Sequence, residues 1–163
     1  MSLRLTEAEI EAFIREPKPL PANWRDRTRL KLKAGHSEAE LEVEGAAGSK
    51  FVVILRRSNV NHLAFSVILG VHLPSGEIFR LRRYNGRNHE HTNPLERETF
   101  YDFHIHMATE RYQGFGKIQN EERYATRTER FADLQGAIEC LLEDCAFREG
   151  PGTQLRLNPR VDD

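Results

Sequence analysis

The strongest constraint on this fold is a strict alternation of charged and apolar side chains in two neighbouring segments, residues 27–33 and 38–44. Basic side chains occupy every second position of RTRLKLK, and acidic ones every second position of EAELEVE. A period of two predicts β-strands with one solvated face. Joined by the four residues AGHS, the segments predict a hairpin that pairs Lys33 with Glu38, Lys31 with Glu40, Arg29 with Glu42 and Arg27 with Glu44. Because the acidic strand cancels the basic one, we do not expect a nucleic-acid site here.

Further strands follow this hairpin. Residues 51–57 are apolar on both faces, which predicts a central strand. Residues 63–73 and 77–84 flank Pro74-Ser75-Gly76, a spacing typical of a three-residue hairpin loop. Pairing Leu73 with Glu77 predicts Gly70 opposite Arg80 and Ile68 opposite Arg82. A sixth strand is expected at 100–108, and its register predicts one shared sheet face for Arg80, Arg82, Tyr84, His104 and His106.

Helices are expected at both ends of the chain. Thr6 and Glu9 form a capping box for a helix over 6–16, and an apolar stripe indicates a second helix over 128–148. The polar segment 85–99 is expected to be a long loop. Together these elements predict an α+β fold, an antiparallel meander of five or six strands with an N-terminal and a C-terminal helix on one face. We expect one domain over 1–150 and a short tail over 151–163.

Composition excludes several classes of protein. The 163 residues carry a formal net charge of −1, with 39% hydrophobic and 30% charged residues, as in folded domains. No apolar run approaches the roughly 20 residues of a membrane span. Acidic residues occupy the place where a secretion signal would be apolar, and the two cysteines fit a reduced, cytoplasmic protein. Cys140 falls opposite the helical stripe that contains Cys145, so we expect Cys140 to be exposed.

Four of the seven histidines form two His-x-His pairs, His89 with His91 and His104 with His106. Imidazoles are good ligands for zinc, copper, iron and nickel, and Asp102 and Glu90 are candidate carboxylates behind them. However, the spacing matches no zinc motif, and the nearby arginines repel a dication. We therefore expect no metal and no cofactor, and a histidine-ligated metal site is a second alternative.

The same histidines combine with arginines in the leading hypothesis. Arginine holds phosphate bidentately, and two imidazoles supply the general base and acid of metal-independent RNA cleavage. We expect a phosphate- or RNA-binding protein in which His104 and His106 are the catalytic pair. The candidate substrate-binding residues are Arg80, Arg82, Arg83, Tyr84, His89, His91 and Arg111.

A resemblance adds a second class of function. The strand ending in RRYN, the loop containing HEH and the later HIH resemble small prokaryotic proteins of toxin–antitoxin modules, in particular the TumE-type family. The stretch FHIHMATERYQ is similar to uncharacterised proteins of phages and mobile elements. The resemblance covers residues 77–112 and implies RNA or a cognate protein as partner. A non-enzymatic protein-interaction module is therefore the first alternative.

Overall fold

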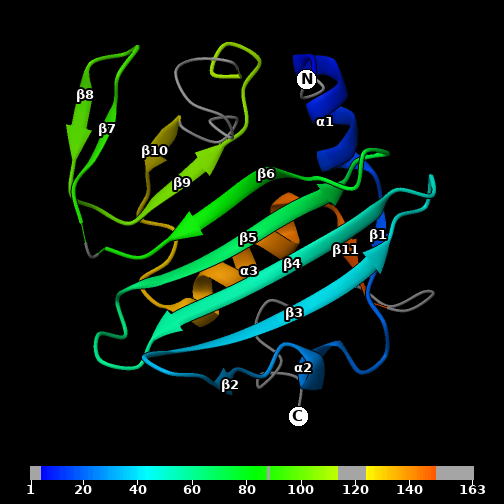
Figure 1. Cartoon of the computed structure of the whole chain (residues 1–163), viewed down its shortest axis with the longest axis horizontal. Coiled ribbons are helices and arrows are strands. Elements are labelled where there is room, and N and C mark those ends of the chain that lie inside the picture. Colours follow the sequence, from blue (N-terminus) through cyan, green and yellow to red (C-terminus); the bar gives the residue numbers. More distant parts are fainter. Residues whose placement is uncertain (1–4, 88, 114–123, 150–163) are drawn as a thin grey trace.

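The computed structural model describes residues 5–87, 89–113 and 124–149. A seven-stranded antiparallel sheet dominates these residues, in the order β10-β9-β6-β5-β4-β3-β2 (Figure 1). Apart from the inserted hairpin β7–β8, neighbours in the sheet are neighbours in the chain, so the sheet is a meander. The expected α+β class is confirmed, with seven strands in this sheet instead of five or six. The strands are β2 (Lys31–Leu32), β3 (His36–Glu44), β4 (Lys50–Ser58), β5 (Phe65–His72), β6 (Ile78–Asn85), β9 (His104–Met107) and β10 (Ala125–Arg127).

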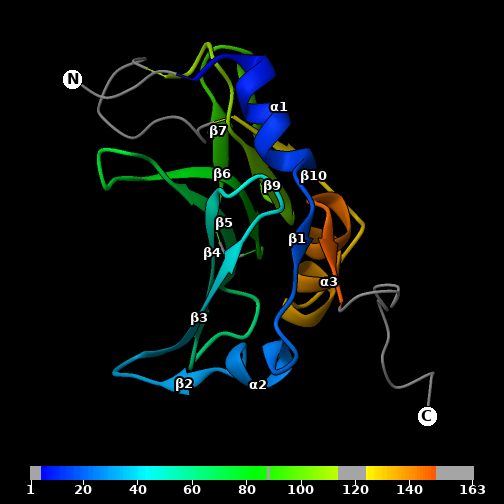
Figure 2. The same ribbon diagram turned by 90° about the vertical axis from the view of Figure 1, so that its right-hand side faces the viewer.

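The helices and a small second sheet cover one side of the large sheet (Figure 2). Helices α1 (Glu7–Arg15) and α3 (Leu134–Asp144) lie there with β1 (Lys18–Pro19), which pairs in parallel with β11 (Phe147–Arg148). A short third helix, α2 (Trp24–Arg27), precedes β2. The expected capping box is confirmed, because the Glu9 amide donates to Thr6 Oγ1 and the Thr6 amide to Glu9 Oε1. No helix in the described part of the chain is long and apolar enough to span a membrane.

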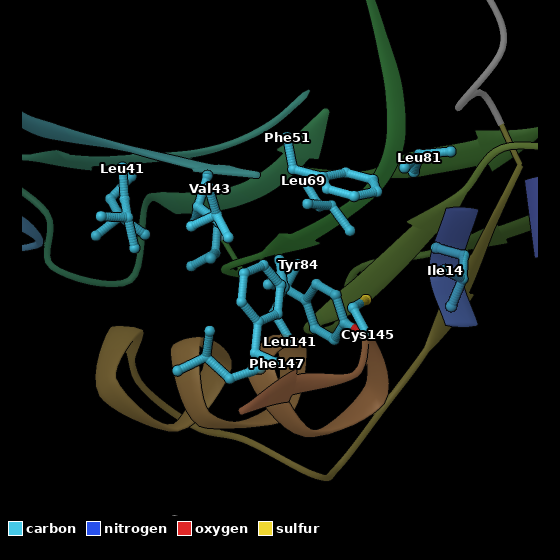
Figure 3. Close-up of a cluster of buried hydrophobic side chains, with 14 of the residues drawn as sticks. Ile14, Leu41, Val43, Phe51, Leu69, Leu81, Tyr84, Leu141, Cys145 and Phe147 are labelled. Atoms are coloured by element: carbon cyan, nitrogen blue, oxygen red, sulfur yellow. The ribbon is translucent and has the colours of Figure 1, made fainter. Parts of the chain in front are cut away.

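The hydrophobic core fills the space between this helical layer and the sheet (Figure 3). Alternate residues of β3 and β4 point into it, as the two-residue period predicts. They meet the apolar stripe of α3, which includes the fully buried Leu141 and continues to Cys145. Cys140 is half-buried and packs against the core, so the expectation of an exposed thiol is wrong.

The first hairpin differs from the expected one at its basic strand. Arg27 ends α2, and only Lys31 and Leu32 pair with β3. Two features account for this: Trp24 is buried and anchors a helical turn, and Gly35, with φ of 82°, forms a tighter turn. Lys31 therefore lies opposite Glu38 instead of Glu40, a shift of two residues that keeps the acidic side chains on the same face. The expected ion pairs are replaced by Glu44 with Lys50, Glu42 with His72 and Arg29 with Asp26.

A β-bulge changes the face on which the arginines of β6 lie. Gly70 lies opposite Arg80 as expected, but Leu69 lies opposite Arg82, so β6 holds one extra residue, Leu81. Because one extra residue reverses the alternation, every later side chain of β6 moves to the other face. The prediction that Arg82 and Tyr84 share a face with Arg80 is therefore wrong.

The segment 85–99 is a hairpin rather than a structureless loop. Strands β7 (His91–Asn93) and β8 (Glu98–Phe100) pair with each other in a separate two-stranded sheet. Figure 1 shows this hairpin beside the β9–β10 end of the large sheet. Arg97, with φ of 60°, provides the left-handed residue of its turn.

The C-terminal helix is shorter than expected. It begins after Asp133, whose side chain accepts from the Gly136 amide, and ends at Asp144 rather than at 148. Residues 125–128 are extended instead, because β10 pairs with β9 and the Thr128 amide donates to the Phe103 carbonyl, and the chain bends at 129–130 and 132–133 before the helix begins. After the helix, Ala146 takes a φ of 63° and turns the chain into β11. The expected tail, 151–163, lies outside the described residues.

Candidate metal centre

Three buried histidines converge from two different sheets. His104 and His106 belong to β9 of the large sheet, and His91 belongs to β7 of the separate two-stranded sheet β7–β8. Their fractional exposures are 0%, 7% and 8%, respectively. One ligand nitrogen from each imidazole can be chosen so that all three lie within 4.8 Å of one another. This group, His91 with His104 and His106, is called the histidine cluster below.

Strand β9 places two of these imidazoles on one face. Residues two apart on a strand point the same way, with backbones roughly 6.5–7 Å apart. The ring centroids of His104 and His106 are only 4.9 Å apart, so the two side chains lean together. The expectation that this pair lies side by side is confirmed.

The β7–β8 hairpin brings in the third imidazole. Asn93 fastens the hairpin to β10, because its Nδ2 donates to the Ala125 carbonyl at 2.7 Å and its Oδ1 accepts from the Ala125 amide at 2.9 Å. The turn of the hairpin is held by Tyr112, which accepts from the Leu95 amide and donates to Glu96. In this position the ring centroid of His91 lies 4.8 Å from that of His106.

Hydrogen bonds assign the protonated nitrogen on two of the rings. His104 Nδ1 lies 2.7 Å from the Asp102 carbonyl, which only accepts, so Nδ1 carries the proton and Nε2 carries the lone pair. His91 Nε2 lies 2.7 Å from Asn93 Oδ1. The Ala125 amide donates to the same Asn93 Oδ1 atom, which shows that this atom is the amide oxygen and accepts. His91 Nε2 is therefore the donor, and the lone pair of the neutral ring is on Nδ1.

The lone pair of His104 is the least satisfied feature of the cluster. Its Nε2 atom is buried and has no hydrogen-bond partner among the residues that the structure describes. A buried polar atom without a partner costs about 1–3 kcal/mol. Burial lowers the pKa of His104 to about 4, assisted by His91, His89 and Arg83 and opposed by the hydrogen bond to Asp102. The imidazole is therefore neutral at pH 7, the form that ligates metals.

The cluster has the donors that a zinc-type ion requires. Zinc–nitrogen bonds of about 2.0–2.1 Å place tetrahedral ligand atoms roughly 3.4 Å apart, so small side-chain movements suffice. A ligating histidine ordinarily donates its other N–H to a carbonyl or carboxylate. His104 does so to the backbone of Asp102, while the Asp102 carboxylate lies 3.8 Å from Arg127. Glu90, the other expected carboxylate, is exposed.

Two other predicted residues lie close to the cluster. Arg83 is the cross-strand neighbour of His106 on the same sheet face, because the bulge brings it there in place of Arg82. His89 is exposed, and its ring centroid lies 5.6 Å from that of His104. It does not belong to the group within 4.8 Å. Arg80 lies on the same face as Arg83, opposite Gly70 on β5.

Three predicted residues have other surroundings. Tyr84 is fully buried, and its hydroxyl donates to Asp144 of α3 at 2.6 Å. Arg82 Nη1 lies 4.0 Å from the same carboxylate and donates a hydrogen bond to the Tyr84 hydroxyl. The prediction that both share a sheet face with His104 and His106 is therefore wrong, because the bulge turns them toward the helical layer. Arg111 forms an ion pair with Glu96 of the β7–β8 turn.

Sequence reasoning missed two residues of the site. Asn93 lies two positions after His91, so a strand period over 91–93 would have placed both on one side of the chain. Phe100 forms part of the wall, with ring centroids 5.5 Å from His91 and 5.8 Å from His104. The sequence pattern places Phe100 in the expected strand 100–108, whereas the structure places it at the end of β8.

Comparisons with known proteins give no match: no family model, no curated protein and no solved structure is significantly similar to this chain. The resemblance of residues 77–112 to TumE-type proteins therefore stays a prediction.

Proposed function

We propose that this protein binds a divalent transition-metal ion of the zinc class through His91, His104 and His106. The observation that carries the proposal is the buried Nε2 of His104, which has no partner in the described residues, in a cluster where one nitrogen from each of three imidazoles lies within 4.8 Å of the others. A metal ion would satisfy this lone pair. Three protein ligands leave one tetrahedral position for water, so a bound ion would supply Lewis-acid, hydrolytic chemistry.

Burial favours this function over metal-independent RNA cleavage. A general base must come within about 2.6–3.2 Å of the 2′-hydroxyl that it deprotonates. The Nε2 atom of His104 is buried, and the rings of His91, Phe100 and His106 have their centroids 5.4, 5.8 and 4.9 Å from that of the His104 ring. RNA binding with cleavage by His104 and His106 is therefore the alternative, and the toxin–antitoxin partner module is a further prediction that needs no histidine chemistry.

Metal analysis tests the proposal. Protein purified without a histidine tag is stripped with chelator and titrated with Co²⁺, followed by the visible absorption of tetrahedral cobalt. We expect one ion per chain, displaced by Zn²⁺ and lost in His104→Ala. The matched control is His62→Ala, an exposed histidine of the β4–β5 loop, which should bind as wild type does.

Two results would overturn the proposal. One is cobalt binding that His104→Ala leaves intact, or no binding by folded wild-type protein. The other is RNA cleavage by chelator-treated protein that His104→Ala abolishes, which would support the acid–base pair.

A further inference from the structure

A cavity of about 730 Å³ lies at one end of strands β6, β9 and β10. Its walls come from the residues that follow β6, precede β9 and follow β10. The sheet brings these segments together, because Asn85 of β6 and Arg127 of β10 are both cross-strand partners of His104. Small-molecule sites have volumes of about 300–1,000 Å³, so this cavity has the size of a ligand site.

Two aromatic rings form the apolar part of the cavity. Phe131 is 5% exposed and Phe103 is half-buried, and their ring centroids are 5.8 Å apart with the planes at 69°. Both rings pack with the hydrophobic core, whereas the next residue, His104, belongs to the histidine cluster on the other side of the strand. The cavity is therefore separate from the proposed metal centre. Aromatic rings pack well against further rings, in offset or edge-to-face contact, so these walls favour an aromatic ligand.

Charged groups of both signs line the same cavity. Arg127 and Asp102 lie 3.8 Å apart, so their charges partly offset each other. Arg87 lies over the ring of Phe103, with its Cζ atom 5.6 Å from the ring centroid. A guanidinium on an aromatic ring is well placed to hold a carboxylate through two N–H donors. Glu129 adds a carboxylate to the wall.

We propose that this cavity, beyond the metal centre, binds a free aromatic α-amino acid. The ring of the ligand packs against Phe103 and Phe131, its carboxylate pairs with Arg87, and its ammonium group faces Glu129. Arg87 follows β6 and Glu129 follows β10, with β9 between them. Strands lie about 4.8 Å apart, so the two backbones are roughly 10 Å apart, which leaves both side chains within reach of one amino-acid head group.

Calorimetric titration with small ligands tests the proposal. The protein is kept in chelator, so that no ligand binds through a metal ion. L-Phenylalanine is compared with three analogues: phenylpropionate lacks the ammonium group, phenethylamine lacks the carboxylate, and alanine lacks the ring. We expect phenylalanine to bind one per chain, and each analogue to bind at least about tenfold more weakly, because each loses one ion pair or the ring contact.

A substitution locates the binding site. Arg87→Gln should weaken phenylalanine binding about tenfold and leave the affinity for phenethylamine unchanged, because phenethylamine has no carboxylate for Arg87 to hold. The matched control is Arg15→Gln, an exposed arginine of α1 that pairs with Glu11 at the surface, and it should bind as wild type does. Circular dichroism confirms that both variants are folded.

Three results would overturn this inference. Folded wild-type protein that does not bind phenylalanine excludes the ligand class. Equal affinity for phenylalanine and any of the three analogues removes the role of the group which that analogue lacks. Equal phenylalanine affinity in wild type and Arg87→Gln places binding elsewhere. All three leave the metal centre intact, because they are measured in chelator, just as failure of cobalt binding leaves this cavity unaffected.

Discussion

Replacing Lys18 with methionine should destabilise the protein strongly, because its ammonium group joins two distant parts of the chain. Lys18 is 0% exposed. Its Nζ donates to the carbonyls of Phe13, Ile14 and Glu16 at the end of α1, at 2.8, 3.0 and 2.9 Å. It also donates to the carbonyl of Cys145 just after α3, at 2.7 Å. The charge therefore caps the C-terminal ends of two helices at once.

The magnitude follows from these four contacts. The ammonium group has three hydrogens for these four carbonyls, so it makes the equivalent of three hydrogen bonds; a charged donor contributes about 1.5–3 kcal/mol to each, and their sum is roughly 5–9 kcal/mol. Burial opposes this and lowers the pKa of Lys18 to about 8. Desolvation of such an ion costs several kcal/mol, which the Lys18→Met variant avoids while keeping the volume of the side chain. The expected net loss is about 3–5 kcal/mol, because four carbonyls lose their donor.

Urea unfolding followed by circular dichroism measures this loss, and a thermal midpoint lower by about 10 °C should accompany it. The control is Lys50→Met, since Lys50 is exposed and pairs with Glu44 only at the surface. Its effect should stay below about 1 kcal/mol. If Lys18→Met unfolds within 1 kcal/mol of wild type, the reasoning that this ammonium holds the helix ends together is refuted.

Three further predictions concern single sites. Burial alone would raise the pKa of Asp144, but hydrogen bonds led by Arg130 outweigh it and lower that pKa, so its stabilising contribution is present above pH ~4 and is lost as pH falls. Asp144→Asn should therefore cost about 2 kcal/mol at pH 7, and the difference from wild type in urea unfolding should vanish in acid. Gly86→Ala should cost about 3 kcal/mol in thermal unfolding, because the added Cβ would lie 1.8 Å from a backbone oxygen. Burial raises the pKa of Cys145 to about 11, so a thiol reagent should modify half-buried Cys140 first and Cys145 only on unfolding; equal rates in native protein would contradict this.

The parts of the fold that local patterns determine were predictable. Alternation located β3, a run that is apolar on both faces located β4, and the spacing around Pro74-Ser75-Gly76 located the hairpin of β5 and β6. The capping box located the start of α1 because both hydrogen bonds lie within four residues. The α+β meander follows from these elements and the short connections between them.

Elements held by distant contacts were not predictable in this way. Strands β1 and β11 have two residues each and pair across 129 positions, Lys18 with Phe147. The turn at α2 depends on the burial of Trp24, a tertiary contact that outweighs the alternating pattern around Arg27. The helix expected from 128 begins only at Leu134, because β10 and Thr128 are hydrogen-bonded along β9 and Phe103.

The candidate site likewise combines a part that follows from a local pattern with a part that depends on distant contacts. The pairing of His104 with His106 needs only the period of a strand, whereas His91 reaches them through a hairpin that Asn93 fastens to β10. The spacing of His89 and His91 is identical, but it does not make them equivalent. Only His91 lies on a strand, β7, and only His91 belongs to the histidine cluster.

The bulge on β6 determines which arginine belongs to the site. Without the extra residue, Arg82 would lie on the face of His106 and Arg83 would point at α3. With it, Arg82 lies near Asp144, whose partly buried carboxylate balances its charge, and Arg83 lies on the face of His106 as its cross-strand neighbour. Gly70, across from the bulge, is a residue type that marks such irregularities in strands. It also leaves room for the side chain of Ile78, whose Cγ2 would lie 2.5 Å from an added Cβ. The extra residue, Leu81, thus changes the role of Arg83. Without it Arg83 would point at α3, and with it Arg83 is the cross-strand neighbour of His106 on the same face of the sheet.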